Sequence, residues 1–286
     1  MMKMELTGIL IMMEDIGIRM QMVSEYGMSN YKLSSSLRYA MERVFLVTGA
    51  SKGIGRSITI GMAKKGFVLI GLARNSDELE SLNMEIKQYN PKSTCIACDM
   101  GNLDDINKSA EIILENYSHL SGIIHNAGTI HPVRGIFESD FHSWNRSISV
   151  NLCGVQSLTS NLQKLIGGNM PTRITTISSG ASRKAVHGWS SYCVSKAGLD
   201  MWTMCLAEEG INHNISAVAV APGVVDTGMQ EEIRNSDINS FPALNDFIEF
   251  KRGGELSNPD EVAAKLIPIF TGEIGENGQR LDIRNL

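Results

Sequence analysis

No stretch of eighteen consecutive apolar residues occurs in the chain, and we therefore expect no membrane-spanning helix. No run of basic residues occurs either, and 26 Lys and Arg against 31 Asp and Glu give a net charge of −5, which argues against a nucleic-acid-binding surface. The five cysteines form an odd, unclustered set, which indicates reduced thiols in the cytoplasm rather than a disulfide framework. Cys95 and Cys98 have no further ligands at zinc spacing, so no metal site is expected. With 286 residues, 43% of them hydrophobic, the chain is expected to be soluble and to form one large core.

The first forty residues differ from the rest of the chain. Eight of them are methionine, and they show no clear periodicity or turn signals. Four acidic residues argue against a secretion or organelle presequence, which should be basic and poor in acids. We therefore expect residues 1–40 to be a poorly ordered extension or the product of an upstream start codon. A dimer arm or a targeting tag is the alternative, and residues 41–286 are expected to form the domain.

From residue 42 onward, strand-like and helix-like patterns alternate. Apolar runs predict strands at residues 44–47, 67–72, 93–98, 122–125, 173–177, 215–220 and 279–283. Helical patterns predict helices at 54–65, from about 75, from about 102, and at 138–166, 189–209 and 259–270. This alternation predicts a single Rossmann-type α/β domain, a doubly wound parallel sheet of about seven strands with helices on both faces. Residues 226–256 are polar, break the regularity and are expected to form a mobile substrate lid.

A glycine-rich loop lies between the first strand and the first helix of this domain. Its glycines are not spaced as in the usual G-x-G-x-x-G pattern, but a strand before and a helix after it are typical of a dinucleotide-binding loop. There Gly49 would allow a sharp turn, Gly53 would let the backbone approach a pyrophosphate, and Gly55 would let the helix pack on the strand. The expected cofactor contacts in this loop are Gly49, Ser51, Lys52, Gly53, Ile54 and Gly55. The alternative is an ordinary glycine-rich turn.

The charges after the second strand favour NADP(H) over NAD(H). A ribose with free hydroxyls is usually held by a carboxylate about twenty residues past the glycine loop, but Arg74 and Asn75 occupy that place. Arg74 and Lys52 offer two cations for a 2′-phosphate, although both could be solvated surface charges. Asp99, at the end of the third strand, suits the edge of an adenine or the start of a helix.

Tyr192 and Lys196 are four residues apart in a helix-like run, so that both side chains lie on one helix face. A free phenol has a pKa of roughly 10. A nearby ammonium lowers that pKa towards the range useful for acid–base catalysis. Such pairs are common on helix surfaces, and the glycine loop about 140 residues earlier is what makes this one significant. Together they predict hydride transfer between a nicotinamide dinucleotide and a carbonyl.

Several motifs, in this order, make residues 42–286 resemble the short-chain dehydrogenase/reductase family. They are the glycine loop, His125-Asn126-Ala127-Gly128, Asn151, Ser178-Ser179, Tyr192-Cys193-Val194-Ser195-Lys196 and Pro222-Gly223-Val224-Val225-Asp226-Thr227. One departure is His125, where the family more often has a second Asn in a structural position.

The resemblance implies an oxidoreductase acting on C=O and CH–OH groups, and it assigns roles to single residues. Tyr192 would protonate the carbonyl oxygen, and Lys196 would lower the phenol pKa and bind the nicotinamide ribose. Ser179 would donate a hydrogen bond to the developing alkoxide, with Ser178 as the alternative. Asn151 would hold a water that links Lys196 to solvent. The resemblance also implies cofactor contacts from Asn126, Ala127, Gly128, Pro222, Gly223, Val225 and Thr227, and a homodimer or homotetramer.

Within the family, the sequence around Ser179, Tyr192 and residues 221–230 looks like the sepiapterin reductases and the benzil reductases that form (S)-benzoin. The resemblance implies NADPH-dependent reduction of a vicinal dicarbonyl, with Trp189 and Met229 near the substrate. Asp282 would anchor a pterin or be a strand-end carboxylate. The alternatives are a 3-oxoacyl-carrier-protein or sugar oxidoreductase of the same fold, and a non-catalytic NADP-binding sensor or scaffold.

Overall fold

The structure, a computed structural model, describes residues 5–6, 9–10 and 42–286, and the chain divides into two units, 1–41 and 42–286. In the first unit, strand β1 (Glu5–Leu6) pairs antiparallel with β2 (Ile9–Leu10). The rest of the expected N-terminal extension lies outside the described residues, so that expectation stays a prediction. Among the described residues, no helix combines the length and the apolar character needed to cross a membrane.

The second unit is built on one parallel sheet of seven strands, which confirms the expected fold class. The strands are β3 (Val44–Thr48), β4 (Val68–Ala73), β5 (Thr94–Ala97), β6 (Gly122–His125), β7 (Thr172–Ile177), β8 (Ile215–Ala221) and β9 (Arg280–Asp282). Their order in the sheet is β5-β4-β3-β6-β7-β8-β9. The chain therefore runs outward from β3 in one direction and then from β6 in the other. The carboxyl ends of parallel strands at such a reversal point are the usual place for a ligand cleft.

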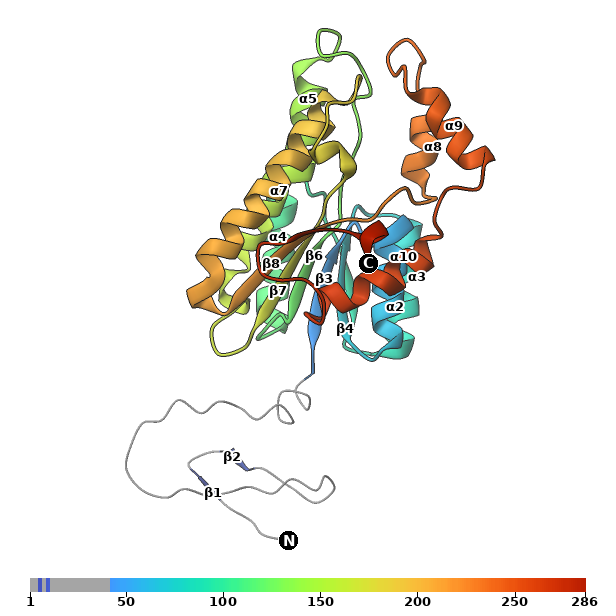
Figure 1. Cartoon of the computed structure of the whole chain (residues 1–286). Helices are drawn as coiled ribbons and strands as arrows, with labels where there is room; N and C mark the ends of the chain where they lie inside the picture. Colours follow the sequence, from blue (N-terminus) through green and yellow to red (C-terminus); the bar gives the residue numbers. More distant parts are fainter. Residues whose placement is uncertain (1–4, 7–8, 11–41) are drawn as a thin grey trace. The chain divides into compact units, whose positions relative to one another are not determined.

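Helices cover both faces of the sheet (Figure 1). One face carries α2 (Gly53–Lys64), α3 (Asp77–Tyr89) and α10 (Pro259–Phe270). The other carries α4 (Leu103–Asn116), α6 (Gly154–Asn161) and α7 (Ser190–Gly210), and α5 (Phe141–Ile148) extends beyond the sheet. Each face has its own buried cluster: Ile58, Leu82 and Leu266 lie in one, and Ile106 and Leu158 lie in the other. The apolar strands are thus buried on both sides.

The long helix expected over residues 138–166 is interrupted. It begins at Phe141, because the Asp140 side chain accepts a hydrogen bond from the Ser143 N–H and caps it. A π-helical turn over Ser149–Cys153 separates α5 from α6, and helix α6 ends at Asn161. Such wider turns are frequent at functional sites, and this one contains Asn151.

The polar stretch 226–256 contains two helices where an irregular segment was expected. They are α8 (Gly228–Arg234) and α9 (Leu244–Arg252). Ile233, Phe241 and Leu244 from this segment are buried in a third cluster that includes Trp189. The two helices were not predicted because the segment is polar overall. They are stabilised by the packing of these few apolar side chains rather than by local helix propensity.

Candidate active site

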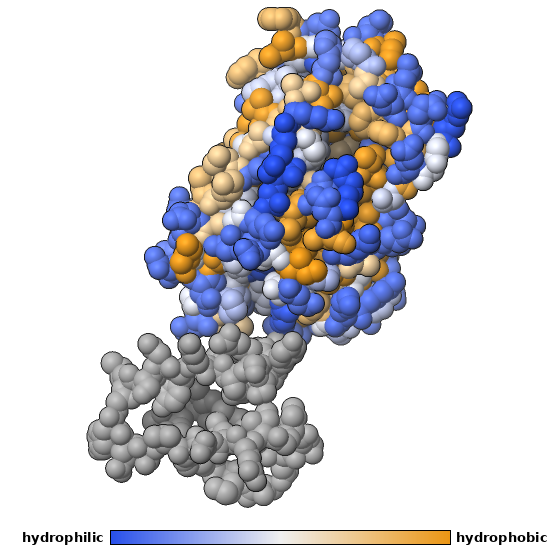
Figure 2. Space-filling view, in the orientation of Figure 1, coloured by the Kyte–Doolittle hydropathy of each residue, from blue (hydrophilic) through white to orange (hydrophobic). Residues whose placement is uncertain are grey.

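A large cleft lies at the carboxyl ends of the strands, with a volume of about 2280 Å³. Small-molecule pockets typically measure roughly 300–1,000 Å³, so this cleft has room for a dinucleotide and a second molecule. Figure 2 shows the surface hollowed between the arm that carries α5 and α7 and the arm that carries α8 and α9. Every residue predicted to contact the cofactor or the substrate lines this cleft. Of the four predicted catalytic residues, only Asn151 does not line it.

Lys196 lies in the first half of α7, and its side chain is buried, with 3% of the residue exposed. Its Nζ donates a hydrogen bond of 2.7 Å to the carbonyl oxygen of Ile177, the last residue of β7. Burial lowers the pKa of Lys196 to about 8, while the negative charge of Asp200 raises it. The ammonium is therefore close to losing its proton in the upper physiological range.

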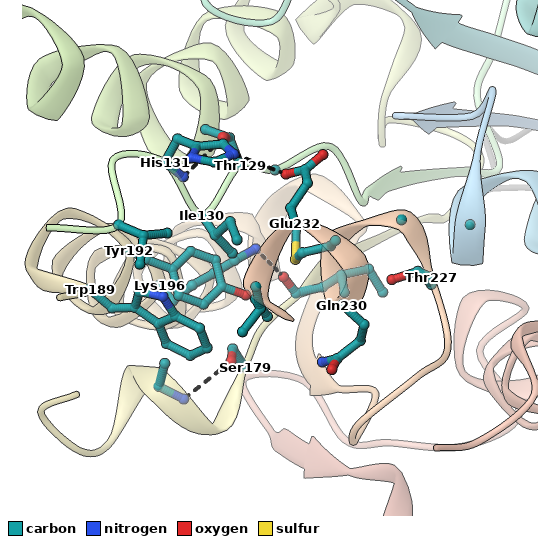
Figure 3. A pocket seen from close by; sticks show the side chains of 18 of the residues that line it. Thr129, Ile130, His131, Ser179, Trp189, Tyr192, Lys196, Thr227, Gln230 and Glu232 are labelled. Carbon is teal, nitrogen blue, oxygen red and sulfur yellow. Dashed lines mark hydrogen bonds and ion pairs between the residues drawn. The ribbon is translucent and has the colours of Figure 1, made fainter. Parts of the chain in front are cut away.

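Tyr192 lies one helical turn before Lys196 and is 7% exposed. The Lys196 Nζ is 5.8 Å from the centre of its ring, and Figure 3 shows both side chains pointing into the cleft. Burial raises the pKa of Tyr192 above its ordinary value, and a hydrogen bond with the Ser179 side chain lowers it. Burial has the largest effect on the phenol, so the net direction in this structure is upward, and a lowering of the pKa of Tyr192 by Lys196 stays a prediction.

Ser179 follows β7 and faces Tyr192 (Figure 3). Its Oγ accepts a hydrogen bond of 3.1 Å from the Ala181 N–H. Ser178 is buried, and its Oγ lies 3.5 Å from the Ser182 Oγ. Ser179 is therefore the serine that lies beside Tyr192, and its hydrogen bond to a developing alkoxide stays a prediction.

Asn151 is fully buried and joins three segments. Its Oδ1 accepts from the Thr129 N–H at 2.8 Å, and its Nδ2 donates to the Thr129 carbonyl and to the Ser195 Oγ, each at 2.9 Å. The side chain thus clamps the π-helical turn to the loop after β6 and to α7. The proton relay through a water at Asn151 stays a prediction.

The glycine loop has the geometry of a phosphate cradle. Gly49 and Gly53 have positive φ angles of 65° and 52°, which side chains rarely tolerate. A Cβ on Gly55 would lie 2.2 Å from the Gly49 carbonyl oxygen, so the helix approaches the loop as closely as the chain allows. The Thr48 Oγ1 accepts hydrogen bonds of 3.0 Å from the N–H groups of Asn126 and Ala127, which fixes the loop after β6 beside it.

The charged groups predicted to bind the cofactor differ in availability. Arg74 is exposed and has no ion pair within the described part of the chain. Lys52 is paired with Glu78 at 2.8 Å, and the Asp99 carboxylate is bound by the Arg146 guanidinium and by the Gly101 N–H. Burial opposes these two bonds, but together they lower the pKa of Asp99.

No sequence pattern indicates that Glu78 pairs with Lys52 or that Arg146 pairs with Asp99. Each lies on a helix well away in the sequence from the residue that it pairs with. Of the groups predicted to bind a 2′-phosphate or an adenine, Arg74 is thus the one without an ion pair among residues 42–286, and its positive charge also helps to lower the pKa of Asp99.

Aromatic residues form one wall on the substrate side of the cleft. Trp189 stacks on Phe241 with ring centres 4.9 Å apart and packs edge-on against Phe247 at 5.5 Å. Met229 packs against the same cluster. Sequence analysis singled out Trp189 and Met229 but missed both phenylalanines, because they lie in the stretch that was expected to be irregular.

Two polar atoms in this region are buried without a hydrogen-bond partner among the described residues. They are the Trp189 Nε1, a donor, and the Gln230 Oε1, an acceptor, and both residues line the cleft. Asp282 also lines it, but Arg284 binds its carboxylate and lowers its pKa to about 2.

The mouth of the cleft is crossed by a polar contact. The His131 Nε2 lies 3.1 Å from the Glu232 Oε2, which connects the loop after β6 to α8 (Figure 3). No group of three or more His, Cys, Asp or Glu that could hold a metal ion occurs in the residues described.

Comparison with known proteins agrees with this geometry. The family model described as short chain dehydrogenase matches residues 43–238. A benzil reductase ((S)-benzoin forming) of Bacillus cereus is 30% identical, covering 84% of this chain and 99% of the relative, and one of Saccharomyces cerevisiae is 33% identical, covering 84% and 95%. The crystal structure of the KRED1-Pglu enzyme superposes with a TM-score of 0.75 at 28% identity, covering 83% of this chain and 99% of that one.

The close approach at Gly55 gives a direct test of the cradle. Gly55→Ala should weaken NADPH binding about tenfold or more, because overpacking costs roughly 1–3 kcal/mol and the new Cβ would collide with the Gly49 carbonyl. Fluorescence titration of purified protein measures this. Gly61→Ala in the same helix is the matched control, since its Cβ meets only the end of the Ile267 side chain, at 3.2 Å. Equal affinities for Gly55→Ala and wild type would contradict the cradle.

Proposed function

Because the chain belongs to the short-chain dehydrogenase family and is therefore an oxidoreductase acting on C=O and CH–OH groups, we propose that it is an NADPH-dependent carbonyl reductase. In this proposal it reduces one ketone of a 1,2-dicarbonyl, and Tyr192 donates the proton. The observation that carries the proposal is the buried phenol of Tyr192, which lies beside Ser179 and one turn from a buried lysine.

The chemistry divides between the cofactor and the chain. Bound NADPH supplies the hydride. Ser179 would donate a hydrogen bond to the substrate oxygen as negative charge develops there. Tyr192 would then give that oxygen its proton, and its raised pKa is no obstacle, because an alkoxide is far more basic than a phenolate. The positive charge of Lys196 would stabilise the phenolate left behind.

The proposed cofactor preference rests on Arg74. Its guanidinium lies at the end of β4, lines the cleft and has no ion pair among residues 42–286. A guanidinium can bind a phosphate through two parallel hydrogen bonds, and the sequence has no carboxylate there that would repel the phosphate. The glycine loop and Thr227, whose Cγ2 would lie 3.1 Å from a Cβ on Gly53, fit the pyrophosphate.

The proposed dicarbonyl substrate rests on the wall opposite the cofactor side and on the relatives named benzil reductase. The rings of Trp189 and Phe247, which both line the cleft, suit a bulky, flat molecule. The Trp189 Nε1 has no partner among the described residues and could donate to a second carbonyl. A buried polar group that only one substrate can satisfy discriminates strongly against the others.

Two further features belong to the proposal. Residues 226–256, with α8 and α9, would act as the substrate lid, since they supply Met229, Gln230 and Phe247 to the cleft. A homodimer or homotetramer would use α7, where Val194, Met201 and Met204 are more than half exposed.

The function is tested by following NADPH oxidation with benzil, sepiapterin, a sugar ketone and an acetoacetyl thioester. We expect the highest kcat/KM with one of the two dicarbonyl compounds. A preference for the thioester or the sugar would replace the dicarbonyl proposal by the corresponding reductase. Tight NADPH binding without turnover of any of the four would favour a non-catalytic sensor.

Tyr192→Phe should lower kcat roughly 100- to 10,000-fold, the usual contribution of a general acid. Its NADPH affinity should stay within about twofold, since removing one hydroxyl leaves the rest of the cradle intact. Steady-state kinetics with the best substrate and fluorescence titration measure the two quantities. If this variant kept most of its activity, Tyr192 would not be the proton donor.

Arg74→Ala should raise the KM for NADPH roughly 10- to 100-fold, because a hydrogen bond to a charged group contributes about 1.5–3 kcal/mol. The KM for NADH should hardly change. Lys52→Ala is the comparison variant and should have a smaller effect, since its ammonium is bound to Glu78. Equal increases for NADPH and NADH in Arg74→Ala would contradict a phosphate contact.

The pH dependence should report Lys196. Reduction requires the proton on Tyr192 and the positive charge on Lys196, and Lys196 loses its proton first, because burial lowers its pKa to about 8 and raises that of Tyr192. We therefore expect kcat/KM for NADPH to be flat below about pH 8 and to fall about tenfold per unit above it. A decline that begins only above about pH 10 would assign the limb to Tyr192 instead.

A further inference from the structure

A buried ion pair between Arg280 and Asp200, neither of which was predicted from the sequence, links Ser179 to the helix turn after Lys196. Arg280 begins β9, and Asp200 lies on α7 one turn after Lys196. Their side chains are only 15% and 14% exposed, and the Arg280 Nε donates to the Asp200 Oδ2 at 2.8 Å. The pair therefore joins the last strand of the sheet to the helix that carries Tyr192 and Lys196.

The same guanidinium also holds the serine. The Arg280 Nη2 donates to the Ser179 carbonyl at 2.9 Å and lies 3.3 Å from the Ser182 Oγ. The Ser182 hydroxyl donates to the same carbonyl at 2.9 Å. Two donors thus fix the backbone of Ser179, whose side chain faces Tyr192.

Asp200, the acidic partner of the pair, acts on Lys196 through its negative charge. Asp200 is the charged group that raises the pKa of Lys196 against the effect of burial. Its second oxygen, Oδ1, is buried without a partner among residues 42–286, so only the Arg280 bond fixes the orientation of this carboxylate. Buried pairs of this kind are weak contributors to stability, because desolvation offsets their attraction.

We propose that Arg280 and Asp200 are positioning residues that align Ser179 and keep the charge on Lys196 beside Tyr192. The inference rests on the proposed reductase function. It assigns to the C-terminal strand a part in catalysis, although neither residue touches the reacting atoms. The Arg280 guanidinium can bind both Asp200 and the Ser179 carbonyl because its planar group carries several donors in fixed directions. The ammonium of a lysine does not have this fixed geometry.

Four variants test the serine end: Arg280→Lys, Arg280→Met, Ser182→Ala and, as a matched control, Arg173→Met. We expect Arg280→Met to lower kcat roughly 100-fold with little change in the KM for the ketone, and Arg280→Lys to recover part of that loss, because misplacement by about 1 Å costs on this scale. Ser182→Ala should lose a smaller factor. Arg173 also bonds main-chain carbonyls, those of Ile269, Ile274 and Gly275, but from the start of β7, so its loss should lower Tm and leave kcat per folded molecule unchanged.

Asp200→Asn tests the lysine end without turnover. In protein labelled with 13Cε-lysine and studied without cofactor or substrate, the pKa of Lys196 should fall by about one unit, because an opposite charge nearby is lost. The alkaline limb of kcat/KM should move to lower pH by the same amount. Arg280→Lys keeps a cation beside Asp200 and should shift the Lys196 pKa less.

Three outcomes would overturn the inference. They are an unchanged kcat in folded Arg280→Met, a kcat loss that only follows the folded fraction as in Arg173→Met, and an unmoved Lys196 pKa in Asp200→Asn. If Arg280→Met does not fold, Arg280→Lys and Asp200→Asn still decide. Lack of turnover by wild type would sink the reductase proposal, and the Lys196 titration would then still test the pair.

Discussion

The buried ammonium of Lys196 is the group on which the arrangement of the site depends. A charge in the protein interior is costly unless it is bound, and Lys196 meets this requirement at the carbonyl of Ile177. That bond fixes α7 against the carboxyl end of β7. Ser179 follows Ile177 by two residues, and Tyr192 precedes Lys196 by one turn, so a single contact brings the phenol and the serine hydroxyl together. The positions of Tyr192 and Ser179 relative to each other thus follow from the hydrogen bond between the buried Lys196 ammonium and the Ile177 carbonyl.

The sheet order supplies the second half of the site. Because β3 and β6 are adjacent parallel strands, the glycine loop and the loop after β6 lie side by side. The Thr48 side chain, at the end of β3, accepts hydrogen bonds from the loop after β6. Asn151 then ties the loop after β6 to α7 through Thr129 and Ser195. The glycine loop and the helix that carries Tyr192 are thus parts of one hydrogen-bonded unit. This explains why the fully buried Asn151 matters to a cleft that it does not line.

How much the sequence could predict depends on how local the cause is. Buried parallel strands are continuous apolar runs, and helix starts such as Ser76 and Asn102 carry their own caps, so these elements were predicted nearly to the residue. The π-helical turn has no local pattern, and α8 and α9 depend on a few buried side chains within a polar stretch. The same holds in the site: Tyr192 and Lys196 are four residues apart, whereas Arg280 lies 101 residues from the Ser179 that it holds. Pairs such as Lys52 with Glu78 and Asp99 with Arg146 depend on tertiary contacts and could not be read from the sequence.

Burial shifts the pKa values of Tyr192 and Lys196 in opposite directions. Oxidation of an alcohol needs a phenolate to accept its proton, and burial disfavours the phenolate of Tyr192 by raising its pKa. Reduction needs the neutral phenol, which burial stabilises, together with a charged lysine, which Asp200 supports. At neutral pH both groups therefore hold their protons, and the site is set to donate one. Desolvation raises the pKa of the phenol and lowers the pKa of the ammonium. The pH range in which both groups are protonated therefore ends near pH 8, where Lys196 loses its proton. Burial of the pair thus keeps both groups protonated at neutral pH, and the pKa of Lys196 limits that range on the alkaline side.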